Sequence, residues 1–340
     1  MKHGANIYKY AKRLGCSSDE IIDFSSNINL YQPQTALHVN NATLTKYAES
    51  GYKALKKIIA DRYALKKSQI ALYNGATAAI YALLDSLKEK NVLLYAPLYG
   101  EYEKAALRSK KDIYKINRIE NLDAPVKKKS IVIFVNPATP EGSFYEIEAL
   151  FGEWKKQKCT IILDESFLEF EGHPSFRMMI QEYKKLYIVQ SFSKFYSCAG
   201  VRIGAVFSHK KNIKKLQPPL WNISSLDVEF LKERLQDAAF KNESLALHVR
   251  QKQELLTILK SCGLFEQIVQ SDANFILVHS PKAKEIFTHL LTHKILVRTC
   301  GSFDYLTDEW LRFAVKDSSS HAALNYALTT YNGETNETHT

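Results

Sequence analysis

The sequence predicts an α/β fold in which a mainly parallel sheet carries helices on both faces. Short apolar, β-branched runs alternate with helical patterns from about residue 50 to residue 210. Parallel strands need long crossover connections, usually helices, so this alternation favours a parallel sheet. The 340 residues, 46% of them hydrophobic, also suffice for one large domain and a smaller one.

The strands expected in the large domain are short and bounded by polar or turn-forming residues. They are Gln69–Tyr73, Val92–Tyr95, Ile131–Val135, Thr160–Leu163, Leu186–Gln190 and Ile203–Phe207. The helices expected between them include Gly51–Tyr63, Ala76–Lys88 and Ile147–Lys156. Ligands of such sheets lie at the carboxyl ends of the strands. The residues that follow each strand are therefore the first candidates for a functional site.

A second region begins after the alternating pattern ends. Asp227–Leu259 has a long helical pattern without strong Gly or Pro breaks, which predicts one helix leading out of the large domain. The strand-like runs ANFILVHS and ILVRTC then flank the helical segment Lys282–His293, and LRFAVKD follows as another strand. We expect an N-terminal arm with part of the small domain at 1–40, the large domain at 41–235, the small α+β domain at 236–331 and a disordered tail at 332–340.

Composition and charge exclude several classes of protein. No apolar run approaches the ~20 residues of a transmembrane helix, and the first residues lack the apolar core of a secretory signal. The five cysteines are widely spaced and form no C-x-x-C pair, which argues against disulfides or a metal site and favours the reducing cytoplasm. The net charge of +10 comes from scattered lysines, so we expect a solvated surface that attracts anionic ligands, without nucleic-acid or membrane partners.

The segment SFSKFYSCAGVRIG follows the expected strand Leu186–Gln190 and combines a nucleophile with phosphate-binding groups. Lys194 can form an imine with an aldehyde if burial and nearby positive charge lower its pKa. Ser191 and Ser193 offer hydroxyl groups to a phosphate, and Arg202 offers a guanidinium. The alternative is an ordinary loop lysine beside serines, and the Gly-Val-Arg-Ile-Gly continuation favours the site.

Two more strand ends carry groups that suit a phosphorylated pyridine. Asp164 follows Thr160–Leu163, where a carboxylate can keep a pyridine nitrogen protonated and make the ring an electron sink. The alternative for this aspartate is a helix N-cap. Gly75, Ala76 and Thr77 begin a helix, where free N–H groups and the helix dipole bind anions. The alternative there is an ordinary Asn-Gly turn.

Other candidate residues could meet the remaining binding requirements of the cofactor pyridoxal 5′-phosphate (PLP). Asn136 in NPATPEG can donate to the phenolic oxygen of the cofactor, although a Pro-rich surface loop is the alternative. Tyr99 in APLYGEYE can stack on the ring, or it is a core tyrosine. Arg298 and Arg312 lie in or beside strands of the small domain. If buried, they need anionic partners, either a substrate carboxylate or phosphate or an intramolecular Asp or Glu.

In this order, the segments resemble the fold-type I PLP-dependent enzymes of the aspartate aminotransferase superfamily. The motifs NGAT, P-x-Y, N-P-x-x-P-x-G, D-E-x-F, S-x-S-K and G-x-R-x-G span Asn74 to Gly204, and the likeness covers nearly the whole chain. The resemblance implies a seven-stranded sheet, and it implies roles for Lys194 (imine), Asp164 (N1), Asn136 (O3′), Tyr99 (stacking), and Gly75, Ala76, Thr77, Ser191, Ser193 and Arg202 (phosphate).

The same resemblance implies a homodimer with a shared active site. Tyr47 occupies the position of a tyrosine that usually reaches the phosphate of the neighbouring subunit. The family pattern at this point is Tyr-Pro-Asp, whereas this chain has Tyr47-Ala48-Glu49. Because each site of such a dimer needs residues of both subunits, we expect the second copy of the chain to be part of the working enzyme.

Within the superfamily the chain is most similar to the histidinol-phosphate aminotransferase branch, and there to the L-threonine-O-3-phosphate decarboxylases of cobalamin biosynthesis. The segments H-G-x-N, DFSSNIN, NGATAAIY, LYGEYE, SKFY and VRTCGSF carry this likeness, with Phe167 where many aminotransferases have tyrosine. The resemblance implies that Asn29 and Arg312 meet the substrate carboxylate. It also implies that His3 and Arg298 lie near the substrate phosphate.

Three departures from the pattern concern the substrate. Ala79 replaces a usual glutamate, Glu141 replaces a usual threonine, and Pro218–Ser224 only loosely matches the P-W-x-V-N of the decarboxylases. These departures leave the expected fold unchanged and bear on the identity of the substrate.

The resemblance leaves a choice between two reactions of one external aldimine. The bond that stands perpendicular to the cofactor ring breaks, so a carboxylate held there leaves as CO2, and a hydrogen held there is removed by Lys194. On resemblance we favour decarboxylation of a small amino-acid O-phosphate. The alternative is an aminotransferase of the histidinol-phosphate type, which uses glutamate and 2-oxoglutarate. A silent binding protein is disfavoured because Lys194 and Asp164 are both present.

Overall fold

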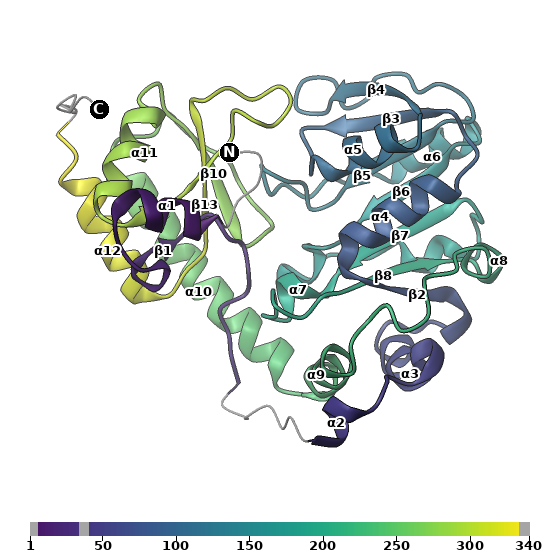
Figure 1. Cartoon of the computed structure of the whole chain (residues 1–340). Helices are drawn as coiled ribbons and strands as arrows, with labels where there is room; N and C mark the ends of the chain where they lie inside the picture. The colour runs from purple at the N-terminus through teal and green to yellow at the C-terminus, as the bar shows by residue number, and fades with distance from the viewer. Residues whose placement is uncertain (1–5, 34–40, 333–340) are drawn as a thin grey trace.

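A computed structural model describes residues 6–33 and 41–332 (Figure 1). Its large domain holds a seven-stranded sheet in the order β2-β8-β7-β6-β5-β3-β4. The strands are β2 (Ile70–Asn74), β3 (Asn91–Ala96), β4 (Asp112–Asn117), β5 (Ile131–Val135), β6 (Thr160–Asp164), β7 (Leu186–Ser191) and β8 (Ile203–Ser208). β8 runs antiparallel to β2 and β7, and the other neighbouring pairs are parallel. The mainly parallel, seven-stranded α/β fold is confirmed.

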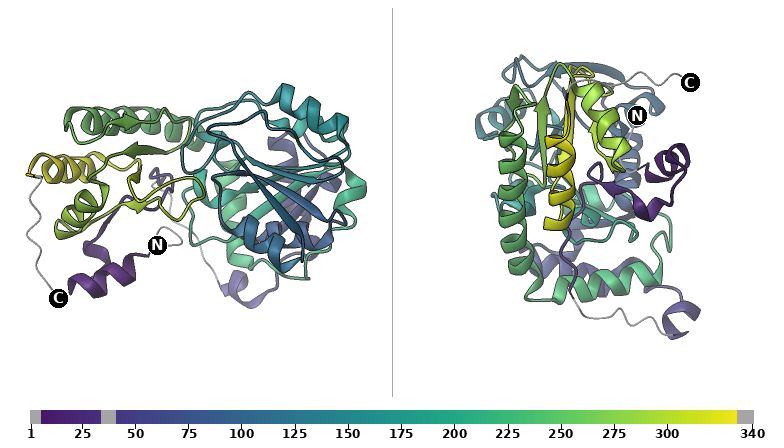
Figure 2. Two further views of the ribbon diagram at one scale, coloured as in Figure 1. Left: turned by 90° about the horizontal axis from the view of Figure 1, so that it is seen from above. Right: turned by 90° about the vertical axis from the view of Figure 1, so that its left-hand side faces the viewer.

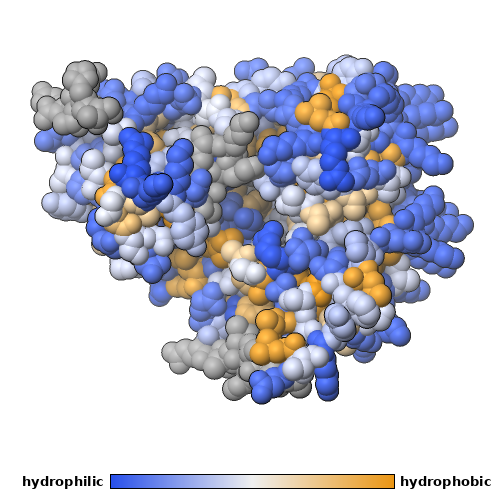
Figure 3. Space-filling model, viewed as in Figure 1, coloured by the Kyte–Doolittle hydropathy of each residue, from blue (hydrophilic) through white to orange (hydrophobic). Residues whose placement is uncertain are grey.

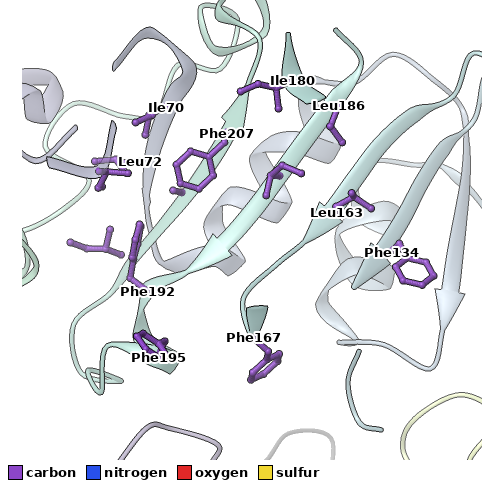
Figure 4. Close-up of a cluster of buried hydrophobic side chains, with 14 of the residues drawn as sticks. Ile70, Leu72, Phe134, Leu163, Phe167, Ile180, Leu186, Phe192, Phe195 and Phe207 are labelled. Carbon is purple, nitrogen blue, oxygen red and sulfur yellow. The ribbon is translucent and has the colours of Figure 1, made fainter. Parts of the chain in front are cut away.

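Both faces of this sheet are covered because its central strands are apolar on both sides. On β5, Val132 and Phe134 belong to one core, and Ile131 and Ile133 belong to the other. Figure 4 shows the first core, where Phe134 and Leu163 project from neighbouring strands. The helices of the large domain are α2 (Asn41–Thr45), α3 (Lys53–Arg62), α4 (Gly75–Ser86), α5 (Glu101–Arg108), α6 (Glu148–Lys156), α7 (Phe192–Phe195), α8 (Lys210–Ile213) and α9 (Ser225–Gln236).

Two features differ from the expected elements. β4 was not among the expected strands because it is an edge strand with polar residues and little apolar character, DIYKIN. The single helix expected over Asp227–Leu259 is wrong, since α9 ends at Gln236 and α10 (Phe240–Ser261) begins after a short break. Asp237 Oδ1 accepts the backbone N–H groups of Ala239 and Phe240, each at 3.1 Å. A local side-chain cap therefore interrupts a helical pattern that periodicity alone reads as continuous.

The small domain has its own sheet and core. Its four-stranded sheet has the order β12-β13-β10-β9, and a separate two-stranded sheet pairs β1 with β11. The strands are β1 (Ile22–Asp23), β9 (Gln267–Ile268), β10 (Phe275–His279), β11 (Ile295–Leu296), β12 (Arg298–Thr299) and β13 (Trp310–Ala314). The helices are α1 (Ile7–Leu14), α10, α11 (Ala283–Thr292) and α12 (Ser318–Thr329). Phe24, Ile276 and Phe313 lie in its core, so the N-terminal segment is part of this domain.

Short 3₁₀ helices connect several of these elements. They are η1 (Ser18–Glu20), η2 (Ser50–Tyr52), η3 (Lys67–Gln69), η4 (Leu168–Phe170) and η5 (Phe176–Ile180). None of the helices within the described residues is both long and apolar enough to cross a membrane. The expected tail at 332–340 lies, except for its first residue, outside the described residues.

The segment that follows β1 passes from the small domain along the large one toward α2 (Figures 1 and 2). Asn29 binds the large domain through its backbone N–H, which donates to the Lys194 carbonyl at 2.9 Å. Gln32 Nε2 donates to the backbone carbonyl and the hydroxyl of Ser197 at 2.9 and 2.6 Å. We call residues 25–32 the N-terminal strap. The strap closes one side of the space between the domains, next to the carboxyl ends of β6 and β7.

Candidate active site

The carboxyl ends of the large-domain strands, the strap and the small-domain sheet enclose a cavity of about 270 Å³. Of the expected site residues, those that line it are Ala76, Thr77, Tyr99, Asp164, Ser191, Ser193, Lys194, Arg202, Arg298 and Arg312. Residues that the sequence did not single out also line it, among them Ser25, Ser26, Asn27, Thr139, Ser166 and Phe303. The structure therefore brings together residues from segments that are up to 287 positions apart in the chain.

The N-terminus of α4 forms one end of the cavity because two glycines allow a close approach. Gly75 has a φ of +77°, and a Cβ there would lie 2.7 Å from Arg202 Nη2. A Cβ on Gly204 would lie 2.3 Å from the backbone nitrogen of Ala76. β8 and α4 can touch only without these side chains. The approach places the guanidinium of Arg202 beside the free N–H groups and Thr77 of the first helical turn, which is a favourable anion site.

Two hydroxyl groups complete this anion site. Ser191 ends β7 and Ser193 lies on α7, and their Oγ atoms are 2.8 Å apart. Thr77 Oγ1 lies 3.3 Å from the hydroxyl of Tyr99, so the expected stacking tyrosine lies next to one of the groups expected to bind phosphate. Hydroxyls, helix N–H groups and one arginine are the donors that proteins use for a phosphate dianion.

Lys194 lies on α7, directly after β7, and its amine faces the cavity. The Nζ atom donates to Asn27 Oδ1 of the strap at 3.1 Å. Burial lowers the pKa of Lys194 to about 8, and the positive charges of Arg312 and Arg202 act in the same direction, against the opposite effect of Asp164. An amine with such a pKa is about one tenth neutral at pH 7, whereas an ordinary lysine is almost fully protonated. The structure thus prepares Lys194 as a nucleophile.

Asp164 ends β6 and is held by three donors. Tyr102 donates its hydroxyl to Oδ2 at 2.8 Å, and Ser166 donates its backbone N–H and hydroxyl to Oδ1 at 3.0 and 2.5 Å. Burial raises the pKa of Asp164, and the hydrogen bonds from Ser166 and Tyr102 oppose that rise. Tyr102 is fully buried on α5. Sequence reasoning missed it, although it stands three residues after Tyr99 in the same LYGEYE segment.

Two cationic side chains dominate the small-domain side of the cavity. Arg298 on β12 and Arg312 on β13 are direct cross-strand neighbours. They are only 2% and 6% exposed. Arg312 donates to Thr139 Oγ1 at 3.0 Å and to the Ser25 carbonyl at 3.3 Å. Arg298 donates to Ser302 Oγ at 2.8 Å.

The electrostatics of Arg312 leave room for an anionic ligand. Its two hydrogen bonds within the described residues go to neutral oxygens, and its Nε has no hydrogen-bond partner there. Burial lowers the pKa of Arg312 to about 10, and the charge of Arg298 acts in the same direction. A carboxylate or phosphate ligand would strongly stabilise the charge of a guanidinium that is buried in this way.

Four expected site residues are placed differently from the rest. Asn29 is turned away from the cavity, because its Nδ2 donates to the Phe195 carbonyl at 2.7 Å and to Ser244 Oγ at 3.0 Å. Asn27, in the same DFSSNIN segment, lines the cavity instead. The side chain of Asn136 pairs with the backbone of Tyr145, with both hydrogen bonds at 2.9 Å, and does not line the cavity.

The other two of these four expected site residues are Tyr47 and His3. Tyr47 is 79% exposed and stacks on Trp221 with 4.4 Å between ring centroids, outside the cavity. His3 lies outside the described residues.

The comparison with family models covers most of the chain. The model of aminotransferase class I and II matches residues 19–330. The chain belongs to this family. It is therefore an enzyme, and it has the fold of a family whose members depend on PLP. The cavity described above has groups that fit this cofactor. The fit rests on the amine of Lys194, the buried carboxylate of Asp164 and the anion site at α4, whose glycines leave space that a Cβ would fill.

Curated relatives of this aminotransferase-family enzyme carry two kinds of name. The adenosylcobalamin biosynthesis bifunctional protein CobDQ of Leptospira interrogans is 29% identical over 93% of this chain, which spans only 39% of that longer protein. The histidinol-phosphate aminotransferase of Flavobacterium johnsoniae is 26% identical, covering 93% of this chain and 94% of the relative. The threonine-phosphate decarboxylase of Salmonella typhimurium is also 26% identical, covering 96% and 95%.

Solved structures show the same family fold. The histidinol-phosphate aminotransferase of Clostridium acetobutylicum has a TM-score of 0.77 and 28% identity, covering 90% of this chain and 97% of that one. The histidinol-phosphate aminotransferase of Sinorhizobium meliloti, solved in complex with PLP, has a TM-score of 0.78 and 18% identity, covering 96% and 94%. The family and its PLP-dependent fold are thus established, and the names of the relatives leave two reactions open.

Proposed function

We propose that this enzyme is a PLP-dependent decarboxylase of a small amino-acid O-phosphate similar to L-threonine O-3-phosphate. The observation that carries the proposal is the pair of buried, adjacent arginines on β12 and β13. Two cations on the side of the cavity away from the phosphate-binding groups suit a substrate with two anionic groups, a carboxylate and a phosphate.

The residues of the large domain hold the cofactor in this proposal. Lys194 would hold the cofactor covalently through its aldehyde, and the buried carboxylate of Asp164 would keep the ring nitrogen protonated. PLP, when bound, supplies the electron sink that accepts the electrons of the bond that breaks. The amide nitrogen of Asn136 carries two hydrogens, so its hydrogen bond to Tyr145 leaves one for the phenolic oxygen of the ring.

Residues of the small domain and the strap orient the substrate. Arg312 binds the carboxylate, since its guanidinium lines the cavity together with Lys194 and its Nε has no partner in the described part of the chain. Arg298 binds the substrate phosphate, and His3 is proposed to lie near the same group. By fixing the direction of the carboxylate, Arg312 would favour its loss as CO2, and a proton would take its place on the Cα atom. Asn27 takes the place expected for Asn29, because Asn27 lines the cavity.

A direct assay tests the reaction. The holoenzyme is incubated with L-threonine O-3-phosphate, and the released CO2 and the amine product are measured together. We expect CO2 and 1-amino-2-propanol O-2-phosphate in equal amounts, and none with a Lys194→Ala variant. An enzyme that releases no CO2, but whose bound cofactor is converted by glutamate to the pyridoxamine form, would contradict the proposal.

The aminotransferase of the histidinol-phosphate type remains the second candidate function. The observation in its favour is the similarity to the Flavobacterium johnsoniae enzyme, which equals the similarity to the Salmonella typhimurium decarboxylase in identity. Its substrates would be histidinol phosphate with 2-oxoglutarate, or the reverse pair with glutamate. The conversion of the cofactor by glutamate in the assay above distinguishes the two reactions in one experiment.

The proposal includes a homodimer. Leu44, Tyr47, Leu220 and Trp221 are between 45% and 79% exposed. Figure 3 shows apolar groups at the lower end of the view, in the region where Figure 1 places α2 and α9. Exposed apolar groups of this kind mark interaction surfaces. We propose that Tyr47 reaches the phosphate site of a second copy, and sedimentation that shows a fully active monomer would contradict this.

A further inference from the structure

A fully buried ion pair lies behind the substrate side of the cavity. Arg118, directly after β4, donates from Nε to Glu141 Oε1 at 2.5 Å and from Nη2 to Oε2 at 3.0 Å. The two side chains are only 0% and 4% exposed. A bidentate pair this deep in the protein fixes both partners, because either charge alone would be left without solvent.

The same arginine also holds the loop that carries Glu141. Arg118 Nη2 donates to the Thr139 carbonyl at 3.1 Å, and Nη1 donates to the Tyr95 carbonyl at 3.3 Å. Gly142 closes the loop with a φ of +83°, and a Cβ there would collide with Ser271 at 2.1 Å. The position of Thr139 is thus determined from both sides, by the ion pair and by the contact with the segment before β10.

Thr139 connects this loop to the substrate side. Its carbonyl accepts from Arg118, and its Oγ1 accepts from Arg312 Nη1 at 3.0 Å. Thr139 lines the cavity and is 7% exposed. A continuous path of hydrogen bonds therefore runs from Glu141 through Arg118 and Thr139 to Arg312.

We propose that Glu141 and Arg118 are positioning residues, which act through Thr139 to hold the guanidinium of Arg312 in the orientation that binds a carboxylate. The physical reason is preorganisation, since a long arginine side chain loses rotamer freedom on binding unless its orientation is already fixed. The inference rests on the proposed function in one respect, the assignment of Arg312 to the substrate carboxylate. It predicts that the preference of this enzyme for ligands with a carboxylate depends on Thr139, although Thr139 itself bears no charge.

The test compares two ligands that do not react because they lack an amino group. They are 3-phosphooxypropanoate, which has a phosphate and a carboxylate, and ethyl phosphate, which has only the phosphate. Calorimetry gives the dissociation constant of each for the wild-type holoenzyme and for Thr139→Val and Thr139→Ser. We expect Thr139→Val to weaken binding of the carboxylate ligand by about tenfold. The substitution removes the hydrogen bond from Arg312 to Thr139, so the guanidinium is no longer held in the orientation that binds the ligand. Ethyl phosphate should bind unchanged, and Thr139→Ser should restore the wild-type ratio.

A wild-type enzyme that binds both ligands equally would refute the carboxylate role of Arg312, and with it that part of the proposed function. A wild-type enzyme that prefers the carboxylate ligand, but keeps its preference in Thr139→Val, would overturn the positioning inference alone.

Variants of the ion pair test the remote half of the path. Glu141→Gln and Glu141→Thr should weaken binding of 3-phosphooxypropanoate without changing that of ethyl phosphate. The double variant Thr139→Val/Glu141→Gln should bind it no more weakly than Thr139→Val alone, because both changes act on one path. Fully additive losses would overturn the coupling. If the Glu141 variants do not fold, as thermal unfolding shows, the comparison of Thr139→Val with Thr139→Ser decides the inference.

Discussion

The cavity has two halves that are assembled in different ways. The cofactor half, which we propose holds PLP, consists of Gly75, Ala76, Thr77, Tyr99, Asp164, Ser191, Ser193, Lys194 and Arg202. These residues lie on the strands of a single sheet or in the segments next to the strand ends. The substrate half, which we propose binds the substrate, consists of Ser25, Ser26, Asn27, Thr139, Arg298, Phe303 and Arg312. These residues come from the strap, from one loop of the large domain, and from β12, β13 and the loop between them in the small domain. The first half therefore depends on one rigid framework, and the second depends on how three segments meet.

The two halves also bind charge by different means. The cofactor half combines helix N–H groups, hydroxyls and the guanidinium of Arg202 around an amine whose pKa burial lowers to about 8. The substrate half contains two adjacent buried guanidinium groups, Arg298 and Arg312, both with lowered pKa. A family can thus keep one cofactor while its members change substrates, because the segments of the substrate half can change without disturbing the sheet.

The largest effect is expected from Lys194→Ala in the cofactor half. Without the amine, the cofactor has no covalent attachment, so the visible absorbance of the lysine-bound form disappears. We expect kcat to fall by at least about 10⁴-fold, as is typical for the loss of a nucleophile. Lys211→Ala, which changes an exposed lysine on α8, is the control and should retain activity. An active Lys194→Ala enzyme would refute the role of this lysine.

In the substrate half, Arg312→Lys and Arg298→Lys should separate the two anionic groups of the substrate. Lysine keeps the charge but loses the bidentate geometry, so we expect KM to rise by about 100-fold in each variant, with an unchanged cofactor spectrum. Arg312→Lys should also lose the preference for ligands with a carboxylate, and Arg298→Lys the preference for ligands with a phosphate. Steady-state kinetics with matched inhibitors measures both, and equal losses for both ligand classes would argue against the assignment.

Tyr102→Phe should affect the cofactor half less strongly. It removes one donor to the Asp164 carboxylate, and because that hydrogen bond favours the ionised form, its loss raises the pKa of Asp164 further. We expect kcat to fall by about tenfold, and the acid limb of the kcat profile to move to higher pH. Tyr81→Phe is the matched control, since its hydroxyl binds Glu101 and it does not line the cavity. An unchanged acid limb in Tyr102→Phe would show that this tyrosine serves packing alone.

The contrast between the halves also explains what the sequence could predict. Lys194 and Asp164 follow apolar strands directly, so local patterns identify them and the parallel sheet brings them together. Thr139 and Arg312 are 173 residues apart, and their contact depends on the packing of two domains, which no local pattern encodes. The assignment of Asn29 to the substrate carboxylate stays a prediction. Asn27 lines the cavity and Asn29 does not, and the strap has no regular period from which the sequence could tell which side chain faces the cavity.

Tyr102 and the break between α9 and α10 show two further limits. Tyr102 looks like any core tyrosine of a helix until the carboxylate of Asp164 is seen 2.8 Å from its hydroxyl. The break depends on the side chain of Asp237, which accepts the backbone N–H of Ala239. Such a local hydrogen bond competes with helix formation, and hydrophobic periodicity does not reveal it.

The smallest expected effect links the two halves through the pKa of Lys194. Burial and the charges of Arg312 and Arg202 lower this pKa to about 8. The unfolded chain therefore binds more protons than the folded one between about pH 8 and pH 10.5, so the stability of the apoenzyme rises with pH across this window. Only the neutral amine attacks the aldehyde, so the rate of PLP recombination with the apoenzyme should rise with pH and level off above about 8.

Arg312→Met tests whether the substrate half contributes to this tuning. The substitution removes a positive charge while keeping a buried side chain of similar length, so the protonated form of Lys194 becomes less unfavourable and its pKa rises. The midpoint of the recombination profile, followed by stopped-flow absorbance, should then move above pH 8, and recombination at pH 7 should slow by a few-fold. An unmoved midpoint would mean that burial and the charge of Arg202, and not that of Arg312, lower the pKa of Lys194. The cofactor half would then be electrostatically independent of the arginines that select the substrate.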